Sequence, residues 1–342
     1  MKQRLPAARF VTLPGGSMPR FDGRLDSDIR RFVARVAEDY ARHPPIETSG
    51  VGERRRIAAS VRSRWSAGGP QMARTVEASA SAAGTSVNVR MHYPSRAETL
   101  PVLVYAHGGG WVLFDLDTHD RLMREYAMRT GAVVVGVDYS RSPEARFPVA
   151  LDEMVAVVRW LQSEGASRGL DAARIGIGGD SAGANLALGA CLKLRDSGAP
   201  HAVRAMVLNY GAFDTDVTTS SHRDFGAGEL LLSSEEMTGF WKSYLRSAED
   251  AGNSYACPLR ADLHGLPAAF MAIAELDILH DENVAMAERM RDAGVPVRAI
   301  VYPGTVHGFV EAMSIARVSG QALDDAAKWF HEQTGLEAET IR

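Results

Sequence analysis

Short, continuously apolar segments alternate with longer segments of helical periodicity from about residue 100 to residue 335. Continuous apolarity predicts strands that are buried on both faces, and their alternation with helices predicts that these strands run mostly parallel. The predicted strands are Val102–Ala106, Ala132–Val137, Ile175–Ile177, Ala205–Leu208, Ala268–Ala274 and Val297–Val301. The predicted helices lie near residues 117–130, 148–164, 182–197, 282–293 and 318–333. The pattern therefore predicts an α/β fold whose mostly parallel central sheet is flanked by helices.

The first 70 residues do not follow this alternation. Residues 1 to about 25 are rich in Pro and Gly and predict an extended lead. Asp26 or Ser27 is then expected to cap a helix that ends near Ala41. A second helix is predicted near Gly52–Trp65, and its run Arg54-Arg55-Arg56 indicates either a solvated helical face or an anion site.

Two further stretches depart from the pattern. Residues 73–79 and 86–93 alternate polar and apolar side chains, which predicts a pair of antiparallel strands. The interval 212–256 is polar and then helical around Glu235–Leu245, so we interpret it as an insertion between two strands.

Composition excludes several classes of protein. The chain has 342 residues, of which 46% are hydrophobic and 23% charged, values typical of globular proteins. The net charge of −4 lacks the basic excess of nucleic-acid binders, so we expect no nucleic-acid partner. The two cysteines, Cys191 and Cys257, form no CxxC pair and suit a reducing compartment. With no apolar signal segment and no apolar run near 20 residues, we expect a cytoplasmic location without a membrane span.

The segment Gly179-Asp180-Ser181-Ala182-Gly183 fits the G-x-S-x-G pattern between a predicted strand end and a predicted helix. In that context the serine occupies a strained turn and is exposed as a nucleophile, with small residues on both sides. A glycine-rich turn that serves only helix packing is the alternative. A dinucleotide fingerprint counted from Gly176 fails, because its third glycine would fall on Ser181.

A second glycine-rich segment, His107-Gly108-Gly109-Gly110-Trp111, directly follows the strand Val102–Ala106. Glycines let the backbone approach a ligand closely, and inward N–H groups could hold an oxyanion. The alternative is a flexible loop. Trp111 suits a substrate pocket or the core equally well.

His307 and Asp277 follow the last two predicted strands. With Ser181 they give the order Ser, Asp, His, which is the order of the α/β-hydrolase triad. Glu275 and Asp281 are rival carboxylates, but Asp277 is placed just past its strand. The ten histidines are scattered and no HExxH pattern occurs, so we expect no metal site and no cofactor.

These motifs resemble the hormone-sensitive lipase family of α/β hydrolases, in its bacterial esterase branch with a GDSAG motif. The segments Asp138–Glu144 and Arg146-Phe147-Pro148 resemble further signatures of that family, and the likeness covers roughly residues 70–335. The resemblance implies an α/β-hydrolase fold with a helical cap. Its expected parts are cap helices in 1–70, a first core part in 71–211, a cap insertion in 212–256 and a second core part in 257–342.

The sequence departs from the family pattern at a few positions. Ile278 follows Asp277 where the family usually has proline, Gly211 replaces a proline near Tyr210, and Cys257 stands where serine is common. The first departure lies directly after Asp277, the proposed acid. We expect Cys257 to be a small packing residue.

The resemblance also implies roles for individual residues. It assigns the oxyanion hole to the amides of Gly109, Gly110 and Ala182. We expect His107, Gly108 and Glu144 to support the glycine loop, and Asp180 either to tune the site or to hydrogen-bond its turn. Residues expected at the substrate pocket are Trp111, Tyr210 and Phe213. Relatives often form homodimers through segments matching Val297–Ile300 and Ser319–Phe330, but core packing explains the apolar stripe there equally well.

Together these features predict a serine carboxylesterase that acts on short- to medium-chain acyl esters. The same residues could serve a deacetylase or amidase acting on an acetylated metabolite, and a true lipase is a further alternative. A binding protein that has lost its catalytic machinery is disfavoured, because Ser181, Asp277 and His307 are all present.

Overall fold

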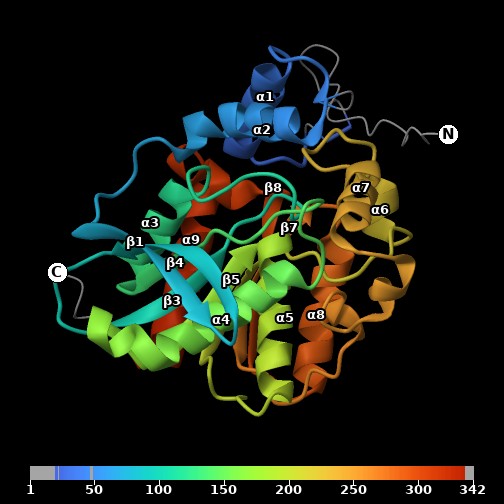
Figure 1. Cartoon of the computed structure of the whole chain (residues 1–342). Coiled ribbons are helices and arrows are strands. Elements are labelled where there is room, and N and C mark those ends of the chain that lie inside the picture. Colours follow the sequence, from blue (N-terminus) through green and yellow to red (C-terminus); the bar gives the residue numbers. More distant parts are fainter. Residues whose placement is uncertain (1–19, 22, 47–48, 336–342) are drawn as a thin grey trace.

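In the computed structural model, which describes residues 20, 21, 23–46 and 49–335, the centre of the molecule is an eight-stranded sheet (Figure 1). Its strand order is β1-β2-β4-β3-β5-β6-β7-β8. The strands are β1 (Arg74–Ala82), β2 (Thr85–Tyr93), β3 (Leu100–Ala106), β4 (Val133–Val137), β5 (Leu170–Asp180), β6 (Ala205–Asn209), β7 (Ala268–Leu276) and β8 (Val297–Val306). Strand β2 pairs antiparallel with β1 and β4, and the pairs from β4 to β8 are parallel. The predicted α/β fold and its antiparallel pair are confirmed.

Helices cover both faces of this sheet. Helices α3 and α9 pack together on one face, and α4 and α5 pack together on the other (Figure 1). Helix α8 lies on the same face as α5, beside β7 and β8. Their bounds are α3 (Asp120–Thr130), α4 (Val149–Glu164), α5 (Ala182–Asp196), α8 (His280–Asp292) and α9 (Arg317–Thr334). Strands β3, β4 and β6 are buried along their whole length, because helices cover both sides of them.

Additional helices lie over the carboxyl ends of the parallel strands, at the top and upper right of Figure 1. They are α1 (Ser27–Tyr40), α2 (Val51–Ser66), α6 (Ser220–Phe225) and α7 (Ser234–Tyr244). Asp26 caps α1, as predicted, by accepting hydrogen bonds from the amides of Asp28 and Ile29. These helices fall within 1–70 and 212–256, and the division of the chain into core and cap stays a prediction.

Some local features differ from the expectations. Strand β5 begins at Leu170 rather than Ile175, because Leu170 pairs with Leu100 ahead of an irregularity in the ladder. Helix α6 has only six residues and therefore shows no apolar periodicity. Most of the extended lead expected over residues 1–25 lies outside the described residues. None of the helices in the described ranges has the length and apolarity needed to cross a lipid bilayer.

Candidate active site

Ser181 lies in a sharp turn between β5 and α5. Its backbone has φ 55° and ψ −118°, a left-handed conformation that costs energy for a residue with a side chain. The turn is tight on both sides, since a Cβ on Gly183 would collide with the carbonyl oxygen of Ala106 and one on Gly179 with the backbone of Gly183. The small residues predicted around Ser181 are therefore required by the packing. The turn places the hydroxyl at the amino end of α5.

His307 is hydrogen-bonded to both of the other residues predicted for the triad, Ser181 and Asp277. Its Nε2 lies 2.9 Å from Ser181 Oγ, and its Nδ1 lies 2.8 Å from Asp277 Oδ2. Asp277 is buried and its Oδ1 accepts a hydrogen bond of 3.0 Å from the amide of Leu279. The three side chains come from the ends of β5, β7 and β8, which lie at the same edge of the sheet.

The rival carboxylates contact other groups. Glu275 accepts a hydrogen bond from the amide of Gly304 and pairs with Arg24 at 3.3 Å. Asp281 accepts a hydrogen bond of 2.9 Å from the amide of Ser221. Of the three candidates, Asp277 is the one hydrogen-bonded to His307.

The glycine loop after β3 lies beside Ser181. Gly109 and Gly110 have φ 107° and 61°, which glycine adopts without strain. Within the described part of the chain, no acceptor pairs with the amide of either glycine. Gly108 donates its amide to Asp180 Oδ1 at 3.1 Å, and a Cβ on Gly108 would collide with that carboxylate. Asp180, which directly precedes Ser181, therefore holds the glycine loop next to the serine.

His107 is buried under the same loop. Its ring stacks on Tyr139 with ring centroids 4.3 Å apart, and its Nδ1 lies 2.7 Å from the carbonyl oxygen of Gly108. Burial, together with the nearby His119, lowers the pKa of His107 to about 3. His107 is consequently neutral at neutral pH.

Glu144 supports the loop through an arginine. It is an exposed side chain and pairs at 2.7 Å with Arg55 of α2. Arg55 also donates hydrogen bonds of 2.8 Å to the carbonyl oxygens of Val112 and Ser142. The interpretation of the arginine run as a solvated face is therefore wrong at Arg55, because its guanidinium binds backbone next to the glycine loop.

A cavity of about 380 Å³ opens over Ser181, His307 and Tyr210. The Tyr210 ring meets the His307 ring edge-on with centroids 5.0 Å apart. Most of the remaining wall is apolar, although Arg62 of α2 also lines it. The apolar lining comes from α1, α2, the segment after the glycine loop, the segment before α7 and α7 itself, and it includes Phe32, Val36, Tyr40, Trp65, Leu113, Phe114, Leu231, Met237 and Phe240. No motif in the chain predicted these wall residues.

Two of the three expected pocket residues lie elsewhere. Trp111 is fully buried and stacks on Tyr244 with centroids 4.3 Å apart. Phe213 is also fully buried, and its amide donates to Glu282 at 2.7 Å. The structure thus corrects the prediction for Trp111 and Phe213, which pack in the core, and places only Tyr210 at the cavity.

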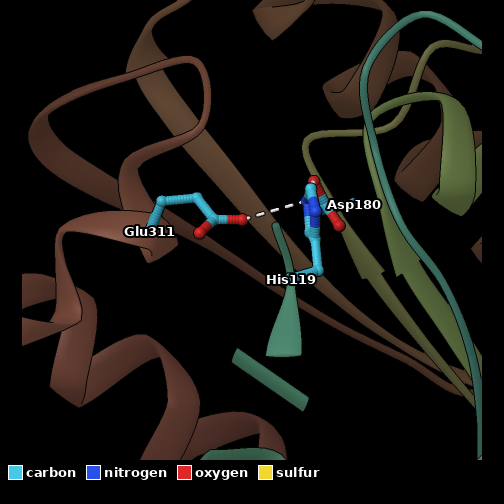
Figure 2. Close-up of side chains that lie close together, drawn as sticks. All are labelled: His119, Asp180 and Glu311. Carbon is cyan, nitrogen blue, oxygen red and sulfur yellow. Dashed lines mark ion pairs between the residues drawn. The ribbon is translucent and has the colours of Figure 1, made fainter. Parts of the chain in front are cut away.

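A buried cluster that the sequence analysis did not anticipate lies behind the glycine loop. It consists of His119, Asp180 and Glu311 and is shown in Figure 2. His119 and Glu311 belong to no recognisable motif, and in the sequence only the position of Glu311 shortly after His307 links the pair to the site.

Comparisons with known proteins agree with the fold described above. The family described as alpha/beta hydrolase fold matches residues 103–311. An acetyl esterase of Salmonella schwarzengrund is 35% identical over 290 residues, which cover 84% of this chain and 89% of the relative.

Solved structures of esterases are similar over nearly their whole length. A hyperthermophilic esterase of the archaeon Pyrobaculum calidifontis has a TM-score of 0.84 and 30% identity, covering 90% of this chain and 98% of that one. A thermostable esterase of Pseudomonas putida has a TM-score of 0.85 and 30% identity, covering 94% of this chain and 100% of that one. The chain therefore belongs to the hormone-sensitive lipase family of α/β hydrolases and is a carboxylic ester hydrolase.

Proposed function

We propose that the chain is a serine carboxylesterase that cleaves short- to medium-chain acyl esters with Ser181, His307 and Asp277. The observation that carries this proposal is the series of hydrogen bonds from Asp277 Oδ2 through His307 to Ser181 Oγ, at 2.8 and 2.9 Å. The series ends at a serine that faces a cavity of substrate size.

The chemistry follows from the order of these groups. Asp277 accepts the Nδ1–H of His307, which leaves Nε2 without a proton and free to act as base. When Ser181 Oγ attacks the ester carbonyl, Nε2 takes its proton and then gives it to the leaving alcohol. Asp277 stabilises the imidazolium in between. Water repeats the sequence on the acyl-enzyme, with Ser181 as the leaving group.

The negative charge of the tetrahedral intermediate needs N–H donors close to Ser181. Ala182 is the first residue of α5, so its amide has no acceptor within the helix. Gly109 and Gly110, whose amides pair with no acceptor in the described part of the chain, line the same cavity as Ser181. These three amides are the proposed oxyanion hole, and the positive end of the α5 dipole adds to it.

The size of the cavity supports the proposed acyl range. About 380 Å³ is near the lower end of the roughly 300–1,000 Å³ typical of ligand pockets, and its walls are largely apolar. The curated relative is named an acetyl esterase, which agrees with a small acyl group. The cytoplasmic location and the homodimer stay predictions.

The test is hydrolysis of p-nitrophenyl esters from acetate to palmitate by wild type, Ser181→Ala and Ser163→Ala. Ser163 is an exposed serine of α4 and serves as the matched control. We expect a short-chain optimum that Ser181→Ala abolishes and Ser163→Ala leaves unchanged. An optimum at palmitate would instead indicate a lipase. Activity that survives in Ser181→Ala would refute the assignment of the nucleophile.

Amide substrates distinguish the proposed esterase from the remaining alternative, a deacetylase or amidase. The same enzymes are assayed on p-nitroacetanilide, whose acyl group matches that of p-nitrophenyl acetate. A kcat/KM higher on the anilide than on the ester would favour the deacetylase or amidase function. Inactivity on both, in a folded wild type, would favour a binding protein.

A further inference from the structure

His119 lies between two buried carboxylates (Figure 2). Its Nε2 is 3.4 Å from Asp180 Oδ2 and 3.1 Å from Glu311 Oε1. All three residues are at most 3% exposed. They come from the residue that precedes α3, from the end of β5 and from the 3-10 turn Phe309–Ser314 that follows His307. Segments far apart in the sequence thus meet at one imidazole.

The cluster connects the proposed oxyanion hole with the cavity wall. On one side, Asp180 precedes Ser181, and its Oδ1 accepts the amide of Gly108 at 3.1 Å. On the other side, Glu311 Oε2 lies 3.3 Å from the guanidinium of Arg62 on α2. Arg62 lines the cavity. The series Arg62, Glu311, His119, Asp180, Gly108 therefore runs from a helix above the site to the glycine loop.

The groups next to His119 indicate that both ring nitrogens carry a proton. Nε2 faces two carboxylates, which accept when ionised. Nδ1 lies 3.1 Å from the hydroxyl of Thr118, which donates its own hydrogen to the carbonyl oxygen of Asp115 at 2.7 Å. That hydroxyl is therefore left to accept from Nδ1. A cationic His119 and Arg62 then balance the charges of Asp180 and Glu311 in a buried place, as burial of charge requires.

The pKa shifts agree with this reading of the geometry. Burial alone would lower the pKa of His119, but the negative charges of Glu311 and Asp180 at ion-pair distance raise it to about 9. Burial likewise opposes ionisation of Asp180, yet His119, Arg62 and the hydroxyl of Tyr105 lower its pKa.

We propose that His119 and Glu311 are positioning residues for the oxyanion hole, holding the Asp180 carboxylate that fastens the glycine loop. The proposal rests on the proposed function, since it assigns the amides of Gly109 and Gly110 to the oxyanion. Asp180 has one oxygen bound by Gly108 and Tyr105 and the other by His119, so its rotation is fixed. Without His119 the carboxylate loses the partner that fixes that second oxygen, and the loop it holds loosens.

A divalent cation is the competing occupant of three such groups, whose donor atoms lie within 4.8 Å of one another. Two contacts argue against it. Arg62 already binds Glu311 Oε2, and a metal would place a second cation next to that guanidinium. A metal bound at Nε2 would also displace the proton that a cationic His119 carries there.

The test compares Glu311→Gln with Asp250→Asn in the whole chain. Both changes remove the charge of a carboxylate paired with an arginine, but Asp250 pairs with Arg246 and lies away from the cavity. Complete loss of one oxyanion donor costs about 10²–10³ in rate, so a loosened loop is expected to cost about tenfold. For p-nitrophenyl acetate we expect Glu311→Gln to lower kcat about tenfold with KM changed less than twofold.

Two further readouts separate positioning from a structural role. A methyl ketone bearing a trifluoromethyl group forms an oxyanion adduct with the serine, so its affinity should fall by the same factor as kcat. The alkaline limb of kcat should also move. Wild type keeps His119 protonated below about pH 9, and removal of one neighbouring carboxylate lowers the pKa of His119, so the limb of Glu311→Gln lies at lower pH. The titratable and charged groups around His119 are Asp180, Glu311, Arg62, His107 and Tyr105.

The proposal is overturned if a folded Glu311→Gln enzyme matches Asp250→Asn in kcat, inhibitor affinity and alkaline limb. A shift of the limb that addition of EDTA to wild type reproduces would favour the metal. If Glu311→Gln does not fold, ¹⁵N NMR of histidine-labelled wild type decides, since a neutral His119 at pH 7 refutes the proposal. Failure of the proposed function has a different signature, because Ser181→Ala then stays active.

Discussion

Replacement of Arg55 by methionine tests how α2 is fastened to the glycine loop. Methionine keeps the length of the aliphatic stem but removes the guanidinium. The guanidinium contacts three residues: it makes an ion pair with Glu144 and donates hydrogen bonds of 2.8 Å to the carbonyl oxygens of Val112 and Ser142. The question is which of them contributes most to stability.

The solvent exposure of each partner determines how much each contact contributes to stability. The Glu144 side chain is 57% exposed, so water and salt screen its ion pair to roughly 0–1 kcal/mol. Val112 and Ser142 are buried, and a hydrogen bond from a charged donor contributes about 1.5–3 kcal/mol. We therefore expect Arg55→Met to lower the free energy of unfolding by about 3 kcal/mol or more. Glu144→Gln should lower it by less than about 1 kcal/mol.

The assay is urea unfolding followed by tryptophan fluorescence, with kcat for p-nitrophenyl acetate measured on the same samples. Because Val112 follows the glycine loop, kcat should fall in Arg55→Met and stay near the wild-type value in Glu144→Gln. Equal losses of stability in the two variants would refute the reasoning, since the ion pair would then carry the contribution assigned here to the carbonyl bonds.

Other perturbations test the turn, the cavity and a buried histidine. Gly183→Ala should lower the free energy of unfolding by more than about 3 kcal/mol, because its methyl group would collide with the backbone of Ala106. As a control in the same urea assay, Gly320→Ala on α9 should raise the free energy of unfolding by about 0.5–1 kcal/mol, because a methyl group there meets open space. Phe240→Ala removes part of the cavity wall and should shift the ester optimum to longer chains, by up to about fourfold in kcat/KM per added methylene. Burial lowers the pKa of His107 to about 3, so below pH 6.5 the unfolded chain gains a proton that the folded chain does not. Stability should therefore fall with falling pH between about 6.5 and 3, and His107→Gln should flatten that fall by up to about 1.4 kcal/mol per pH unit in urea titrations.

Much of the sheet follows from sequence because its strands are buried on both faces. Such strands can contain few polar residues, so strands such as β4 and β6 stand out without any knowledge of their neighbours. In the first part of β5, the residues Asp171–Arg174 are partly or fully exposed and two of them are charged, and the segment joins the sheet only because Leu170 pairs with Leu100 of β3. No local pattern carries that information.

The residues of the candidate site also fall into those that the sequence predicts and those that it does not. Ser181, Asp277 and His307 follow strands whose ends meet at one edge of a parallel sheet, so chain order and strand position were enough to group them. His119 and Glu311 are polar residues whose burial depends on partners far away in the sequence. A surface position is the ordinary expectation for such residues, and only the folded structure shows that they contact each other.

The residue after Asp277 shows how the insertion contributes to the proposed triad. Ile278 stands where relatives usually have proline, a residue that stiffens a turn through its fixed φ. Here the turn is held by hydrogen bonds from α6: the hydroxyl of Ser221 donates to the carbonyl oxygen of Ile278 at 2.6 Å, and its amide donates to Asp281 at 2.9 Å. Asp277 itself accepts the amide of Leu279. The position of the acid is therefore set partly by the segment 212–256, and changes there that alter substrate range must keep the contacts of Ser221 if the enzyme is to keep its rate.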